Sequence, residues 1–174
     1  MAAGRAFHSA LSSAPRPTFL ATRTHPWAVA DRVAWGEASV TTLPEIAALL
    51  SRLESLRLPI AADCQLVHGD LSGNVLFASG QSTAIIDFSP YWRPAAYADA
   101  IIAVDGLLWF DAGPDLLRLA DTSPDFPQML LRALIFRLVA TNERARDTAA
   151  DFRDELAAFD VTASAVEALL RSAS

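Results

Sequence analysis

Four polar residues near the middle of the chain stand in an order that suits catalysis. His68 and Asp70 flank a glycine, and Asn74 and Asp87 follow them. Both aspartates lie at the end of an apolar run. Taken singly, an aspartate in such a place caps a turn, and a histidine in an apolar run is a hydrogen-bonded core residue. Taken together, these residues indicate one chemical site.

The segment between Asn74 and Asp87 is predicted to form a β-hairpin. Its strands are expected over 74–78 and 83–88, with a turn at 79–82. Pairing outward from this turn places Asn74 opposite Asp87, with Cβ atoms about 5 Å apart. A carboxamide oxygen beside a carboxylate suits Mg²⁺, which takes its remaining ligands from water and substrate phosphates. We therefore predict a metal site at Asn74 and Asp87.

Asp70 is the candidate for acid–base chemistry beside this metal site. It lies in a loop with Gly69 and Gly73, two glycines that permit tight backbone turns. Phosphoryl transfer needs an acid that positions and deprotonates the attacking hydroxyl, while a metal offsets the charge of the phosphates. The pattern thus predicts phosphoryl transfer. A metal-dependent phosphohydrolase that uses Asp70, Asn74 and Asp87 is an alternative.

The order H-G-D, then N, then I-I-D-F over residues 68–88 resembles the aminoglycoside phosphotransferase family, within the protein-kinase-like fold. The resemblance implies that Asp70 is the catalytic base and that His68 supports the loop by hydrogen bonding to backbone. It also implies that Asn74 and Asp87 bind metal. The expected cofactors are Mg²⁺ and ATP, and the expected substrate is a small molecule with a hydroxyl group.

Two features depart from this family pattern. Kinase loops place four residues between D and N, whereas only Leu71, Ser72 and Gly73 separate these positions here, so Ser72 is a further candidate cofactor ligand. All 14 basic residues are arginine, and the seven glycines form no G-x-G-x-x-G. The N-terminal β lobe that covers ATP in this fold is therefore expected to be absent. We expect a truncated form that is inactive alone.

The elements around the loop are expected to be mainly helical. The fold class is mainly α with a small β-hairpin (α+β), resembling the C-terminal lobe of the protein-kinase-like fold. A single domain over 1–174 is predicted, with a helical lead-in (1–60), the catalytic loop and hairpin (65–90) and a helical subdomain (95–174). Two capping boxes, Thr42–Glu45 and Ser164–Glu167, are read as helix starts. Helices are predicted at 3–13, 27–35, 42–56, 95–110, 114–120, 125–141, 144–158 and 163–172, and a further strand at 65–67.

Composition excludes several classes of protein. A hydrophobic fraction of 52% with 20% charged residues argues against disorder. The net charge of −6 argues against a nucleic-acid partner, because phosphate binding needs a basic face. No segment reaches the roughly 18 apolar residues of a membrane span, so no membrane partner is expected. The single Cys64 excludes an intramolecular disulfide and suits a cytoplasmic protein.

The sequence does not identify the hydroxyl acceptor. The acidic balance suits a cationic acceptor, with Asp99 and Asp105 as residues to receive it. Trp92, Trp109 and Phe110 are candidates to line its pocket, although aromatic residues at helical spacing also suit the core. The alternative function is a pseudokinase-like, non-catalytic binding module. Such a module would pair with itself or with another chain over the face left by the missing lobe.

Overall fold

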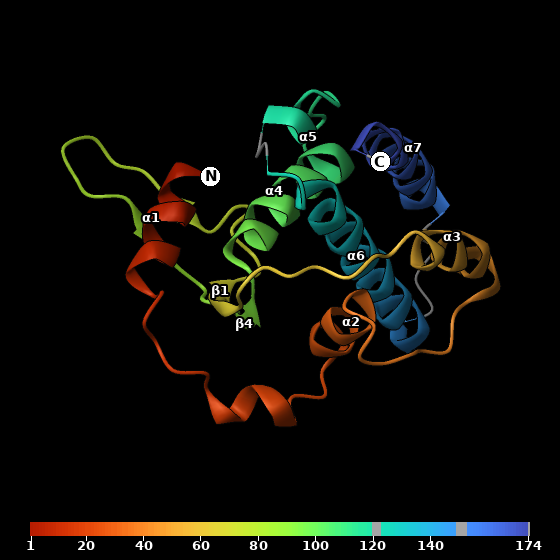
Figure 1. The fold of residues 1–174 in the computed structure, drawn as a ribbon, viewed down its shortest axis with the longest axis horizontal. Helices are drawn as coiled ribbons and strands as arrows, with labels where there is room; N and C mark the ends of the chain where they lie inside the picture. Colours follow the sequence, from red (N-terminus) through yellow and green to blue (C-terminus); the bar gives the residue numbers. More distant parts are fainter. Residues whose placement is uncertain (120–122, 149–152, 174) are drawn as a thin grey trace.

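The computed structural model describes residues 1–119, 123–148 and 153–173, which form a helical body with two short antiparallel strand pairs (Figure 1). The order of elements is α1 (Ala2–Ala10), the 3₁₀ helix η1 (Thr18–Thr22), α2 (Pro26–Ala34), α3 (Pro44–Ser55), β1 (Gln65–His68), β2 (Val75–Leu76), β3 (Ala84–Ile85), β4 (Pro90–Arg93), α4 (Ala95–Trp109), α5 (Leu116–Leu119), α6 (Phe126–Thr148) and α7 (Arg153–Ala173). None of the described helices is both long enough and apolar enough to cross a bilayer.

Helix α6 forms the centre of the body. Helices α2, α3, α4 and α7 all pack against it, and Figure 1 shows them arranged around its length. Residues 128–142 of α6 are all buried, which requires a helix that is apolar nearly all round. The predicted apolar stripe of α3 is confirmed, since its four members are buried: Ile46, Leu49, Leu50 and Leu53.

The strand pair β1–β4 lies at the edge of this body, against α1 and α4, and carries the catalytic loop at its end. Its register pairs Gln65 with Arg93 and His68 with Pro90. A proline fits at the first position of a strand because it has no backbone N–H for the ladder. The sequence predicted β1 and did not predict β4.

The β2–β3 hairpin exists, but its register differs from the prediction by one residue. Val75 pairs with Ile85, and the backbone N–H of Ile86 donates to Asn74 O (3.1 Å), so Asn74 lies opposite Ile86 and not opposite Asp87. The hairpin projects from the body beside α1 (Figure 1). Register is specified strongly only where one face of a strand is buried. Here Leu76 is exposed, so the apolar pattern had no core to define the pairing.

Both predicted capping boxes are wrong. The N-cap of α3 is Leu43, and the side chain of Asn142 from α6 binds this end of the helix, accepting from Leu43 N (2.9 Å) and donating to Thr41 O (3.1 Å). Ser164 lies inside α7, where its hydroxyl donates to Asp160 O.

The helix breaks predicted at 142–143 and 159–162 are also wrong, since α6 and α7 continue through them. Asn142 is tolerated inside α6 because its amide makes these tertiary hydrogen bonds instead of competing for the helix backbone. The part of the predicted 144–158 helix at 149–152 lies outside the described residues.

Candidate functional site

His68 ends β1 and supports the loop that follows it. Its ring is fully buried; Nδ1 accepts from the backbone N–H of Asp70 (3.0 Å) and Nε2 lies 3.1 Å from Ile86 O. A ring whose Nδ1 accepts and whose Nε2 donates is the neutral Nε2–H tautomer. The expected hydrogen bonds from His68 to backbone are confirmed, and they connect the loop to the hairpin strand that leads to Asp87.

The short spacer after Asp70 closes as a tight turn. Asn74 N donates to Leu71 O (3.1 Å), and the Asn74 side chain donates from Nδ2 to Asp70 O (2.8 Å). Gly73 has φ +82°, a left-handed conformation that glycine adopts without strain. The turn therefore returns Asn74 to Asp70 although the spacer is one residue shorter than in kinase loops.

Asp70 is oriented by a buried arginine on α6. Nη2 of Arg137 lies 3.0 Å from Asp70 Oδ1, and 43% of the Asp70 side chain stays exposed. Arg137 also binds the buried carboxylate of Asp105 on α4 through Nε (2.7 Å) and Nη2 (2.6 Å). The hydroxyl of Ser72 donates to Asp105 Oδ2 (2.7 Å), so this candidate ligand is engaged in supporting Asp105.

Helix α1 packs directly onto the loop. Nε2 of His8 accepts from the backbone N–H of His68 (3.0 Å). Burial, and then the neighbouring His68, lower the pKa of His8 to about 4, which keeps the ring in the neutral form that accepts this bond. Gly4 contacts Leu71 so closely that a Cβ at position 4 would lie 2.6 Å from Leu71 Cδ1. The N-terminal helix thus fixes the loop from the side of β1.

A cavity of about 370 Å³ opens beside Asp70. Such a volume suits a small organic molecule. Three aromatic side chains and several polar groups surround it, and the lining residues are Arg23, His25, Trp27, Gly69, Asp70, Ser89, Tyr91, Phe136 and Arg137. Gly69 is required at this wall, because a Cβ there would collide with the Tyr91 ring.

The acidic residues that the sequence offered for a cation are already paired. Asp105 is 1% exposed and binds Arg137, while Asp99 is 3% exposed and binds Arg5. The predicted aromatic residues Trp92, Trp109 and Phe110 all lie outside the lining of this cavity, although the Trp109 ring contacts Arg137. The cavity beside Asp70 is therefore lined by other residues than those we expected.

Asn74 and Asp87 remain neighbours despite the shifted register. Asp87 follows directly after Ile86, whose backbone N–H binds Asn74 O, and its carboxylate is exposed. The φ of Asp87 is +50°, an uncommon conformation for a residue with a side chain. Among the described residues no three His, Cys, Asp or Glu side chains form a metal-binding cluster. The donor set fits an ion that takes most of its ligands from water and phosphate.

Sequence reasoning missed the residues that surround Asp70. Arg137 stands inside the otherwise apolar stretch 133–140 of α6, and a charged residue in a buried stretch indicates a buried polar or charged partner. Arg23, Trp27 and Tyr91 gave no such signal, because only the fold brings η1, α2 and β4 to one wall.

Comparison with known proteins connects this geometry to a family. Residues 2–131 match the family described as the phosphotransferase enzyme family. This match spans both the helical lead-in and the catalytic loop, and it confirms the identification made from residues 68–88. No curated protein and no solved structure matches the chain.

Proposed function

The chain belongs to the phosphotransferase enzyme family, and from this premise we propose that it supplies the base and the metal ligands of an enzyme that transfers the terminal phosphoryl group of ATP to a hydroxyl group of a small molecule in the cytoplasm. One observation carries the proposal. A partly exposed carboxylate, Asp70, stands at the wall of a ligand-sized cavity, with one oxygen bound to Arg137 and its backbone N–H bound to His68.

Asp70 takes the role of general base in this proposal. Its carboxylate accepts the proton of the acceptor hydroxyl while the hydroxyl oxygen forms a bond to the terminal phosphorus of the donor. The bond from that phosphorus to the bridging oxygen breaks, and ADP leaves with the electron pair. Arg137 holds Asp70 Oδ1, so Oδ2 is the oxygen left to face the hydroxyl.

The residues that would hold a magnesium ion are Asn74 and Asp87. The Nδ2 of Asn74 donates to Asp70 O, so its Oδ1 would be one ligand oxygen, and the exposed carboxylate of Asp87 would supply the other. A bound Mg²⁺ supplies charge neutralisation for the phosphates of the donor. Because Asn74 binds the backbone of Asp70, this arrangement couples the metal ligands to the base.

The test is transfer of phosphate by the purified chain and, because a truncated form is expected to be inactive alone, by the longer protein that the expected truncation implies. ATP and Mg²⁺ are incubated with sugars, sugar acids, amino alcohols and aminoglycosides, while ADP formation is followed and products are identified by ³¹P NMR. Asp70→Asn should reduce transfer by about 10²–10⁴-fold, the range of general-base catalysis. Asp115→Asn, which alters an exposed carboxylate outside the cavity, is the matched control and should transfer normally. Full turnover in Asp70→Asn would remove this residue from the mechanism.

A second function, the non-catalytic binding module, is favoured by the hairpin surface. Leu76, Phe77, Ile86 and Phe88 are exposed, and Phe77 is 78% exposed. Grouped apolar side chains of this kind mark interaction sites. If a second copy covers them, sedimentation velocity should show a concentration-dependent dimer that Phe77→Asp abolishes. A monomer at all concentrations would contradict self-association.

A further inference from the structure

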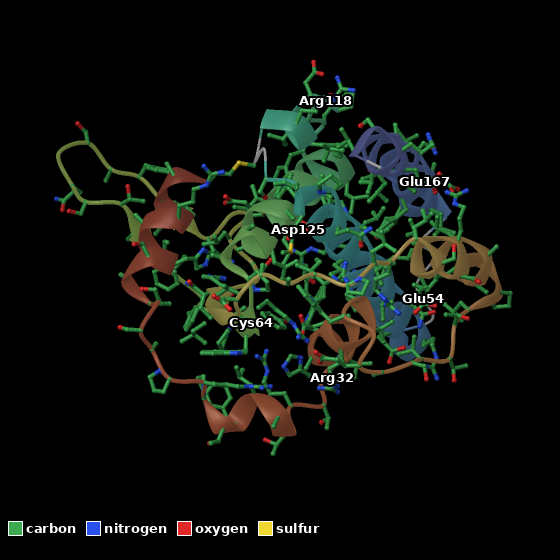
Figure 2. All side chains as sticks on the ribbon, viewed as in Figure 1. Arg32, Glu54, Cys64, Arg118, Asp125 and Glu167 are labelled. Carbon is green, nitrogen blue, oxygen red and sulfur yellow. The ribbon has the colours of Figure 1, made fainter. Side chains whose placement is uncertain are left out.

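Positive charge gathers around the cavity beside Asp70, on a chain whose net charge is −6. Arg23 lines this cavity and also a smaller neighbouring one of about 80 Å³, whose lining includes Arg16 and Arg32. All three arginines lie within residues 16–32, from just before η1 to within α2. Figure 2 shows Arg32 on α2, on the side of the molecule where η1 lies.

Among the described residues, the groups that bind the guanidinium of Arg23 are all uncharged. Its Nε donates to Nε2 of His25 (2.8 Å), its Nη1 donates to Pro90 O, and its Cζ lies 5.0 Å from the centre of the Tyr91 ring. Among the side chains that the structure describes, no carboxylate lies within ion-pair distance of Arg23. These contacts fix the guanidinium in place, while no described side chain serves as its counterion.

The nearby acidic residues do not supply that counterion. Asp31 and Glu37 line the smaller cavity, but Arg93 binds both carboxylates, with shortest distances of 2.7 Å and 2.6 Å. Arg137 binds the two remaining acids near this cavity, Asp105 (2.6 Å) and Asp70 (3.0 Å). Each of these four carboxylates is therefore bound by an arginine other than Arg23, although Asp70 and Asp105 share one.

The pKa of His25 is affected by the same positive charges. Its pKa is lowered by burial first, and then by the charges of Arg23 and Arg32. A neutral His25 can accept the hydrogen bond from Arg23, whereas a protonated one would add to the repulsion. Besides Asp70 and Arg137, the lining of this cavity therefore includes a fixed cation, an imidazole and aromatic rings.

We propose that the acceptor is a small hydroxylated acid whose carboxylate or phosphate group binds Arg23 while a hydroxyl faces Asp70. The substrate class rests on the proposed phosphotransferase function, whereas the anion site itself does not. An arginine fork matches a planar carboxylate or a phosphate through two parallel hydrogen bonds. A polycationic acceptor could bind one partly exposed carboxylate, Asp70, but it would be repelled by the positive charge of Arg23, which no described carboxylate pairs.

Calorimetric titration at low salt, without nucleotide, tests the site with four six-carbon probes. Gluconate carries a carboxylate, glucose 6-phosphate a phosphate, glucose no charge and glucosamine a positive charge. At least one anionic probe should bind ten-fold or more tightly than glucose, and glucosamine should bind no better than glucose. Gluconate and glucose 6-phosphate together decide which anion the site takes. Anionic probes that bind no better than glucose, including no binding at all, would overturn the proposal.

Variants connect this binding to Arg23. Arg23→Gln should weaken the anionic probe at least ten-fold, and Arg23→Lys, which keeps the charge, should retain part of the affinity. Arg118→Gln is the matched control, because Arg118 is an exposed arginine on α5 at the opposite end of the molecule (Figure 2). Folding is checked by circular dichroism. Equal affinity in Arg23→Gln and wild type would refute the assignment.

The two proposals can fail separately. If anions bind through Arg23 and no acceptor is phosphorylated, the anion site stands and the phosphotransferase function falls. If glucosamine or an aminoglycoside is phosphorylated and the anionic probes do not bind, the phosphotransferase function stands and the proposed acceptor class is wrong.

Discussion

Replacing Arg137 with methionine should strongly destabilise the fold. The Asp105 carboxylate accepts three hydrogen bonds, two from Arg137 (2.7 and 2.6 Å) and one from Ser72 (2.7 Å). Arg137→Met leaves this carboxylate, 1% exposed, with the single bond from the Ser72 hydroxyl. Breaking a buried pair from one side costs about 3–5 kcal/mol, a large part of the roughly 5–15 kcal/mol that stabilises a domain.

The assay is urea unfolding at pH 7 followed by circular dichroism. Arg146→Met is the matched control, since Arg146 pairs with Glu143 at the surface of the same helix (3.1 Å) and should change the free energy of unfolding by about 0.5 kcal/mol or less. The double variant Arg137→Met, Asp105→Asn removes the unpaired charge and should recover about 2 kcal/mol relative to Arg137→Met alone. A free energy of unfolding for Arg137→Met within 1 kcal/mol of wild type would refute the reasoning.

Two further changes test the loop and its supports. Between pH 6.5 and about 4, His8 becomes protonated in the unfolded chain but not in the folded chain, so the free energy of unfolding should fall as the pH drops through this window. The glutamine side chain in the variant His8→Gln can still accept the hydrogen bond from His68 N but does not titrate. In urea unfolding, the free energy of unfolding of this variant should fall by about 1–2 kcal/mol less than that of wild type between pH 7 and 4. An equal loss in both proteins would contradict this. Gly69→Ala should cost about 1–3 kcal/mol, because its Cβ meets the Tyr91 ring, whereas Gly113→Ala enters open space and should be nearly neutral by thermal unfolding. Equal melting temperatures for the two glycine variants would contradict the packing at Gly69.

The part of the site that is local in sequence could be predicted from the sequence alone. His68, Asp70 and Asn74 lie within seven consecutive residues, 68–74, and their order predicted both the family and the hydrogen bonds of His68 to backbone. The α3 stripe was predictable for a similar reason, since its apolar spacing is a property of one helix.

Features that depend on distant partners were not predictable in this way. The N-terminal end of α3 is bound by Asn142, about a hundred residues away in the sequence, so the capping box predicted locally at Thr42 was wrong. The hairpin register failed because exposed strands have no core to select it. Arg137 binds Asp70 only because the fold brings α6 next to the catalytic loop, 67 residues earlier in the chain.

The measurement that tests the account most directly is calorimetric titration of the chain with ATP and Mg²⁺. The proposed site predicts binding that is lost in Asp87→Ala and kept in Asp111→Ala. These two aspartates form a matched pair, because both are exposed and both have positive φ, +50° and +52°. Asp70→Asn should bind nucleotide normally, since its role is in transfer. Binding that survives in Asp87→Ala would contradict a phosphotransferase site built from these residues, and no binding by the wild-type chain would mean that this chain alone is not a nucleotide enzyme.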